Sequence, residues 1–242
     1  MATQKVALVT GANKGLGKEI ARQLGNQGFT VVVGARDDKA GQSAVDELKK
    51  DGVKEAFAVK LEVTNPDHIA SAAKWVSDKF GKLDVLVNNA GISLDWDGSA
   101  MTAEMIRKTY EVNVIGQWQV SEAFLGLLSK SDDARIINHS SILGSIGSYE
   151  NAWDQMSGFA TFAYAQSKAA LNMMTLLQSK KLKDKNIAVA AAHPGWVKTE
   201  LGSDAAPMEV QDGAKTAVGL ATMPRDKFPH GTLSHMGERL PW

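Results

Sequence analysis

The chain has 242 residues, with 27 lysines and arginines against 27 aspartates and glutamates, and it contains no cysteine. This length suffices for one α/β domain with a full core, and the missing cysteines exclude disulfides, cysteine-ligated zinc, iron–sulfur clusters and thiol catalysis. A net charge of zero provides no long-range field for polyanions, so we expect neither nucleic acid nor a membrane surface as a partner.

Short apolar runs alternate with longer amphipathic segments along the whole chain, which is typical of βαβ units and a parallel sheet. Most runs are continuously apolar, as in strands that are covered on both faces. The predicted strands are 6–10, 30–34, 56–61, 85–88, 134–139, 187–192 and a weak one at 232–234. The predicted helices include 16–26, 40–50, 66–80, 103–128 and 162–182. We predict an α/β fold with one domain over 1–242, a doubly wound parallel sheet of about seven strands with helices on both faces.

Glycines cluster directly after the first predicted strand, in Thr10-Gly11-Ala12-Asn13-Lys14-Gly15-Leu16-Gly17. Between a strand and a helix, glycines permit a tight turn and a close approach of the backbone to a pyrophosphate, which the helix N-terminus attracts. No Gly-Lys-Ser/Thr follows, which argues against a mononucleotide P-loop. We therefore predict a dinucleotide site rather than a plain turn. Its expected residues are Gly11, Asn13, Lys14, Gly15, Leu16 and Gly17.

The end of the second predicted strand indicates which dinucleotide binds. An acid here would accept the ribose hydroxyls of NAD, but Ala35 stands at that place and Arg36 follows it. A guanidinium suits a 2′-phosphate, and Lys14 could add a second positive charge. We favour NADPH/NADP as the cofactor. The alternative is that Arg36 is a solvated loop charge paired with Asp37.

Tyr164 and Lys168 lie four positions apart in a predicted helix, so their side chains share one face. A nearby ammonium lowers the pKa of a phenol, which would let Tyr164 exchange a proton with a carbonyl or alcohol oxygen. Such a pair also arises by chance, so it carries weight only together with other motifs.

Several motifs accompany this pair, in order, along nearly the whole chain. They are the glycine loop, Asn88-Asn89-Ala90-Gly91, Val112-Asn113-Val114, Ser140-Ser141, Tyr164-Ala165-Gln166-Ser167-Lys168 and Pro194-Gly195. The sequence thereby resembles the short-chain dehydrogenase/reductase superfamily, which implies a Rossmann fold and oxidoreductase activity. Within it, the chain looks most like the NADPH-dependent carbonyl reductase group. That narrower resemblance rests on residues 11–15, 35–37, 193–199 and 229–242.

The resemblance implies a catalytic tetrad of Asn113, Ser141, Tyr164 and Lys168. Tyr164 would protonate the substrate oxygen while a hydride leaves the nicotinamide, and Ser141 would orient that oxygen. Lys168 would lower the pKa of Tyr164 and hold the nicotinamide ribose. Asn113 would anchor a water that links Lys168 to solvent.

The resemblance also implies cofactor contacts after the third, fourth and sixth predicted strands. The expected residues are Glu62, Val63, Asn89, Ala90, Gly91, Pro194, Gly195, Trp196, Val197 and Thr199. Thr199 would bind the nicotinamide carboxamide. Glu62 stands where the family usually has Asp beside the adenine amine.

Ser141 and Tyr164 lie further apart than is usual in the superfamily, and the extra residues fall in an irregular stretch at 144–160. Bulky apolar groups there and nearby would form a hydrophobic substrate pocket. The expected pocket residues are Trp96, Leu143, Trp153, Met156 and Trp196. The alternative is that the insertion packs under its own aromatic side chains.

We therefore predict an NADPH-dependent carbonyl reductase that acts on a hydrophobic ketone or aldehyde. The alternatives are an NADP-dependent alcohol or steroid dehydrogenase working toward oxidation, and a non-catalytic NADP-sensing protein. The two longest predicted helices could pack against a partner in a homodimer or tetramer, although the insertion could block this. The five scattered histidines predict no metal site. Residues 1–4 leave no room for a secretory leader before the first strand, so we expect a cytoplasmic protein.

Overall fold

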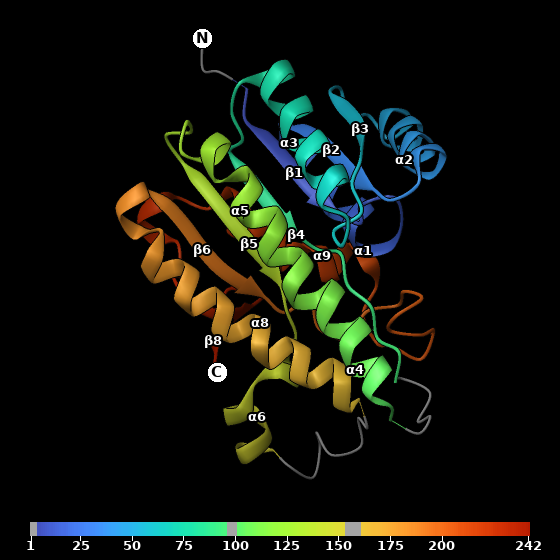
Figure 1. Ribbon diagram of the computed structural model, residues 1–242, viewed down its shortest axis with the longest axis vertical. Helices are drawn as coiled ribbons and strands as arrows, with labels where there is room; N and C mark the ends of the chain where they lie inside the picture. The colour runs from blue at the N-terminus through green and yellow to red at the C-terminus, as the bar shows by residue number, and fades with distance from the viewer. Residues whose placement is uncertain (1–3, 96–100, 153–160) are drawn as a thin grey trace.

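The centre of the molecule is one eight-stranded sheet in the order β3-β2-β1-β4-β5-β6-β7-β8 (Figure 1). The computed structural model describes residues 4–95, 101–152 and 161–242. Strands β1 to β7 pair in parallel, whereas β8 is antiparallel to β7. The strands are β1 (Val6–Thr10), β2 (Thr30–Ala35), β3 (Ala56–Lys60), β4 (Val85–Asn88), β5 (Ala134–His139), β6 (Ile187–Ala192), β7 (Leu233–His235) and β8 (Glu238–Leu240). The predicted doubly wound parallel sheet is confirmed, and β8 extends its edge.

Helices cover both faces of this sheet (Figure 1). The described helices are α1 (Gly15–Asn26), α2 (Asp38–Lys50), α3 (Pro66–Phe80), α4 (Ala103–Tyr110), α5 (Gln117–Leu128), α6 (Ile146–Asn151), α8 (Phe162–Lys181) and α9 (Val210–Thr222). One face carries α1, α2 and α9, and the other carries α3, α5 and α8. Neither α6 nor α9 is among the predicted helices, and α6 forms where an irregular stretch was expected.

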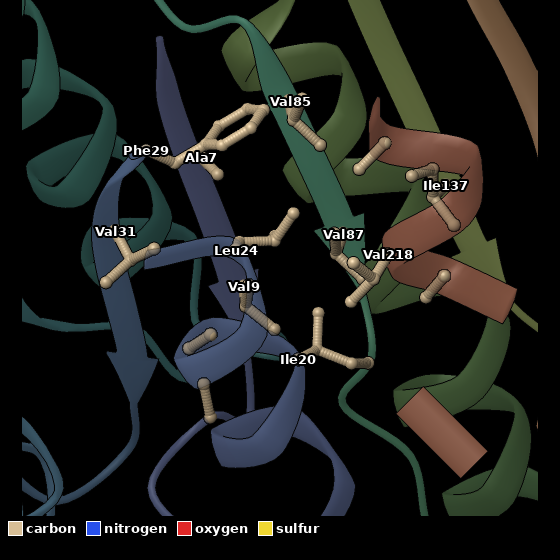
Figure 2. Packing of buried hydrophobic residues seen from close by; sticks show 14 of the residues in the cluster. Ala7, Val9, Ile20, Leu24, Phe29, Val31, Val85, Val87, Ile137 and Val218 are labelled. Carbon is tan, nitrogen blue, oxygen red and sulfur yellow. The ribbon is translucent and has the colours of Figure 1, made fainter. Parts of the chain in front are cut away.

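Two apolar cores join the sheet to these helix layers. Figure 2 shows the core beneath α1 and α9, where Val9 and Val87 of the sheet meet Ile20 and Val218 of the helices. The second core lies between the sheet and the helices α3 and α5. Strands β2, β5 and β6 are buried at every residue. Burial on both faces is the physical reason that β6 is apolar throughout, whereas β5 also carries the buried polar residues Arg135, Asn138 and His139.

The predicted helix 103–128 is interrupted in its middle. A π-helical segment, η1 (Glu111–Gly116), separates α4 from α5. Within it, the Asn113 side chain forms two hydrogen bonds with the main chain of Ile92. Oδ1 accepts from the Ile92 N–H at 2.8 Å, and Nδ2 donates to its carbonyl at 2.9 Å. A π segment depends on such tertiary contacts, so helical periodicity alone could not predict it.

One buried arginine fixes α9 to the sheet. Arg135 of β5 is 1% exposed and donates to the carbonyls of Leu220 and Met223, both at 2.7 Å. Carbonyls at a helix C-terminus need partners from outside the helix. The same guanidinium donates to the Asp133 carboxylate at 2.9 Å. Arg135 therefore acts as a C-cap for α9.

Replacing Arg135 with Met should lower the free energy of unfolding by about 3 kcal/mol, because buried carbonyls and a carboxylate lose their donor. Lys5 is a matched control, since its ammonium binds Asp133 at 2.8 Å but its side chain is 43% exposed. Lys5→Met should cost less than about 1 kcal/mol. Urea denaturation of both variants measures the difference, and equal losses would contradict the capping role.

Candidate active site

The predicted functional residues gather where the parallel strands end. The sheet order reverses between β1 and β4, which are direct neighbours. In open α/β sheets, ligands bind at such a reversal, outside the C-terminal ends of the strands. The segments that follow β1, β4, β5 and β6 carry the glycine loop, Asn89, Ser141 and residues 194–199. The chain topology therefore brings these distant segments to one edge of the sheet.

The glycine loop has the backbone that a phosphate site requires. Gly11 and Gly15 are left-handed, with φ of 63° and 52°. A Cβ on Gly11 would lie 3.1 Å from the Cα of Ala90, so the loop lies directly against the segment after β4. Among the described residues, no side chain caps the N-terminus of α1. The first N–H groups of α1, which include that of Leu16 and follow Asn13, are therefore suited to bind a phosphate.

The segment after β4 holds this loop in place. The Thr10 hydroxyl accepts from the N–H groups of Asn89 at 2.9 Å and Ala90 at 3.0 Å. The Asn89 amide donates in return to the Thr10 carbonyl at 2.9 Å. A Cβ on Gly17 would lie 2.5 Å from Nδ2 of Asn89, so only glycine fits there without a shift.

The charges that we expect to select the dinucleotide lie at the surface. Arg36 is exposed at the end of β2. The Asp37 carboxylate accepts from the Ala40 N–H at 2.7 Å and so caps α2. Within the described residues, Asp37 therefore has a role other than pairing with Arg36. Lys14 forms an ion pair with Glu200, which belongs to the segment after β6.

The residues expected beside the adenine have different surroundings. Val63 is buried, and its Cγ2 lies 2.9 Å from the position that a Cβ on Gly116 would take. The Glu62 side chain is 44% exposed, with its carboxylate 3.8 Å from Nδ1 of His68. Val63 is thus fixed by η1, whereas Glu62 lies at the surface.

The loop after β6 approaches the glycine loop. The Thr199 Cγ2 lies 3.7 Å from the position that a Cβ on Gly15 would take. Val197 is buried, while Trp196 is 36% exposed and its indole donates to the Gly202 carbonyl at 2.5 Å. Pro194 and Gly195 lead from β6 into this loop. The predicted contacts 194–199 therefore lie opposite the N-terminus of α1.

Lys168 lies at the centre of the predicted tetrad. It is 3% exposed, and its Nζ donates to the His139 carbonyl at 2.7 Å. The same atom is 5.4 Å from the ring centroid of Tyr164. A Cβ on Gly91 would lie 3.4 Å from Oδ1 of Asn113 and 3.7 Å from Nζ of Lys168. Gly91, in the segment after β4, therefore lies close to both side chains.

Ser141 and Tyr164 face each other from two different elements. Ser141 precedes the 3₁₀ turn η2 (Ile142–Gly144), and its hydroxyl accepts from the Leu143 N–H at 3.1 Å. The side chains of Ser141 and Tyr164 share a hydrogen bond. The structure therefore brings together all four residues of the predicted tetrad, from η1, from the position before η2 and from α8.

Burial changes the pKa values of Tyr164 and Lys168 in opposite directions. Burial raises the pKa of Tyr164 to about 12, although its hydrogen bond with Ser141 acts against the shift. Burial also lowers the pKa of Lys168 to about 7. The expected lowering of the Tyr164 pKa is therefore wrong for this arrangement, because desolvation disfavours the charged form of both groups.

Two residues with no predicted role, His139 and Asp95, also lie in this site. Burial lowers the pKa of His139 to about 3, and neither ring nitrogen has a partner in the described part of the chain. Asp95 is 1% exposed and accepts from the Ala163 N–H at 2.6 Å, at the start of α8. The position of His139, two residues before Ser141, could have indicated that it lies in the site. Nothing in the sequence links Asp95 to α8.

The family model for short chain dehydrogenase matches residues 5–210. The chain belongs to the short-chain dehydrogenase/reductase family. (+)-Neomenthol dehydrogenase of Arabidopsis thaliana is 35% identical to it, over 95% of each chain. NADPH-bound carbonyl reductase from chicken fatty liver is 32% identical, with a TM-score of 0.86 over 99% of each chain. A 7α-hydroxysteroid dehydrogenase in complex with NADH is 28% identical, with a TM-score of 0.80 over 96% of this chain and 92% of the other.

Membership establishes an oxidoreductase that acts on CH–OH or C=O groups with a nicotinamide cofactor. Among the described residues of this short-chain dehydrogenase, no helix has the length and apolar content to span a bilayer. The same residues contain no group of three or more His, Asp or Glu side chains that could hold a metal.

The expected substrate pocket of this short-chain dehydrogenase is described only in part. Leu143 is 8% exposed and packs with Tyr164 in a small apolar cluster. Other members of this cluster are Ile142, Tyr149, Ala152, Ala165 and Leu201. Three of the predicted pocket residues, Trp96, Trp153 and Met156, lie outside the described residues. Tyr149 belongs to the stretch 144–160 that was expected to line the pocket, whereas Leu201 lies just beyond the predicted contacts 194–199.

The buried ammonium of Lys168 should make stability depend on pH. The unfolded chain holds this proton up to its ordinary pKa of 10.5, but the folded chain releases it at about 7. Between about pH 7.5 and 9.5, the unfolded state binds more protons, so stability should rise with pH by up to about 1.4 kcal/mol per unit. The buried histidines have lowered pKa values and titrate below this window.

Lys168→Met should remove this rise. Chemical denaturation at several pH values in the window measures the slope for both chains. An unchanged slope in Lys168→Met would assign the effect to another group.

Proposed function

We propose that this short-chain dehydrogenase is an NADPH-dependent carbonyl reductase that reduces a hydrophobic ketone or aldehyde. The observation that carries the proposal is the geometry around the buried Tyr164 phenol, which shares a hydrogen bond with Ser141 and has the Lys168 Nζ 5.4 Å from its ring centroid. A protonated phenol held between a hydroxyl and an amine can donate its proton to a carbonyl oxygen, as reduction requires.

In this proposal, the bound nicotinamide supplies the hydride for the carbonyl carbon. The Tyr164 Oη donates its proton to the carbonyl oxygen, so the C=O bond becomes CH–OH. The Ser141 hydroxyl donates a hydrogen bond to the same oxygen as negative charge develops there. Lys168 would hold the nicotinamide ribose when the cofactor is bound. Asn113, in η1, anchors a water through which solvent resupplies the proton.

The residues of the glycine loop fit a dinucleotide. The uncapped N-terminus of α1 offers N–H groups to the pyrophosphate, and the left-handed Gly11 and Gly15 keep side chains out of its path. The exposed Arg36 suits the 2′-phosphate that distinguishes NADP from NAD. The chicken carbonyl reductase carries NADPH and the 7α-hydroxysteroid dehydrogenase carries NADH, so the preference depends on this chain's own charges.

Two alternatives are distinguished by experiment. An alcohol or steroid dehydrogenase working toward oxidation would use the same residues, with Tyr164 as the base, so assays in both directions separate it from a reductase. A non-catalytic NADP sensor would have no use for four aligned tetrad residues. The apolar cluster of Leu143 and Tyr149 beside Tyr164 supports a hydrophobic substrate, near which we place Trp196.

A homo-oligomer and a cytoplasmic location stay predictions. Exposed apolar side chains on the two long helical segments are compatible with packing against a second copy. These side chains are Ile115, Trp118, Phe162, Met173 and Leu177.

The central test is NADPH oxidation with a panel of hydrophobic ketones and aldehydes. Tyr164→Phe should lower kcat by about 10²–10⁴-fold, because the proton donor is removed. Its NADPH Kd, measured by fluorescence titration, should stay within about twofold. Tyr110→Phe removes a phenol from α4 and should leave kcat unchanged. Full activity of Tyr164→Phe would refute the mechanism, and tight NADPH binding without turnover of any carbonyl would favour the sensor.

Cofactor choice is tested separately. Arg36→Ala should lower kcat/KM for NADPH by about tenfold or more, since a charge-assisted phosphate contact is lost, but should change kcat/KM for NADH little. Lys50→Ala removes the same charge at the far end of α2 and is the control. Equal use of NADPH and NADH by the parent chain would overturn the assignment.

A further inference from the structure

A buried amide connects the Ser141 segment to the helix that carries Tyr164 and Lys168. Asn172 lies one turn beyond Lys168 on α8 and is 3% exposed. Its Oδ1 accepts from the Ser140 hydroxyl at 2.6 Å, and its Nδ2 donates to the Gly144 carbonyl at 3.0 Å. These two partners bracket Ser141 in the sequence. One side chain therefore forms hydrogen bonds to both ends of the segment 140–144, which carries Ser141.

The contact between this segment and α8 is also tight at the backbone. A Cβ on Gly144 would lie 2.4 Å from the carbonyl carbon of Lys168 and 2.6 Å from the Ala169 nitrogen. The Ser140 hydroxyl lies 3.4 Å from the Lys168 carbonyl oxygen. The main chain after β5 thus packs directly on the turn of α8 that carries Lys168.

We propose that Asn172 is a positioning residue, which fixes the Ser141 hydroxyl relative to the Tyr164 phenol. The inference rests on the proposed function, because it concerns the oxygen atoms that would meet the substrate carbonyl. An asparagine suits the task since one amide supplies both the acceptor for Ser140 and the donor for Gly144. Losing it leaves buried polar groups unpaired and frees the segment to shift. A displacement of about 1 Å at reacting groups can cost about 10²-fold in rate.

The competing explanation is that Asn172 only stabilises the fold. Thr175, on the next turn of α8, separates the two roles. It is fully buried and accepts from Nδ2 of Asn138 at 2.9 Å, so it ties the same helix to β5 without touching the Ser141 segment. Thr175→Val keeps the shape of the side chain and removes this hydrogen bond. It is the matched control for a structural effect.

The experiment measures kcat, KM for the best ketone, the NADPH Kd and Tm in the full-length chain. Asn172→Ala should lower kcat about 10- to 100-fold, while the NADPH Kd changes less than about threefold. Ser140→Ala, a milder change that removes one of the two hydrogen bonds, should lower kcat less. Thr175→Val should lower Tm comparably to Asn172→Ala and leave kcat at the parent value.

A double-mutant cycle with Ser141→Ala decides whether Asn172 acts through the serine. In the Ser141→Ala background, adding Asn172→Ala should cost less than about threefold in kcat, because the hydroxyl to be positioned is already absent. If Asn172→Ala lowers kcat by the same factor with and without Ser141, the two residues act independently and the inference is overturned. A parent-like kcat in both Asn172→Ala and Ser140→Ala would also overturn it. A parent chain that turns over no carbonyl overturns the proposed function, and this inference with it.

Discussion

The hydrogen bond from the Lys168 ammonium to the His139 carbonyl is the contact on which the site depends. A lysine that is 3% exposed keeps its charge only if oxygen atoms replace the lost water. The end of β5 supplies one such atom, while the close approach of Gly144 brings the main chain after β5 against α8. Because this glycine permits the contact, α8 lies near enough to β5 for Tyr164 to reach Ser141.

The same burial assigns the proton-transfer roles. Desolvation favours the neutral forms of both Tyr164 and Lys168, so the phenol holds its proton while the lysine readily gives one up. At neutral pH the group beside Ser141 is thus a protonated phenol. A positive charge arriving near the phenol would favour the phenolate, so the direction of proton transfer is coupled to the charge of whatever occupies the site.

Much of the fold could be predicted from the sequence, because strands buried on both faces are mostly apolar, as in β2 and β6. The tetrad could be predicted from its motifs, since the strand order determines where each loop emerges. What escaped prediction depends on tertiary contacts: η1 needs the Ile92 backbone, and α9 needs the Arg135 cap. The sign of the Tyr164 pKa shift was missed for a related reason, because spacing along a helix reveals a neighbouring charge but not the loss of water.

Cofactor choice and chemistry rest on physically different groups in this chain. The tetrad is buried and fixed by short hydrogen bonds, so small displacements there are costly. Arg36 and Lys14 are exposed, and Lys14 already has a counter-ion in Glu200. Exposed charges are screened by solvent and contribute modestly to folding stability, so these residues can be replaced without disturbing the packing of α8. Selectivity between NADPH and NADH should therefore vary independently of kcat, since no described contact joins Arg36 to the Lys168 environment.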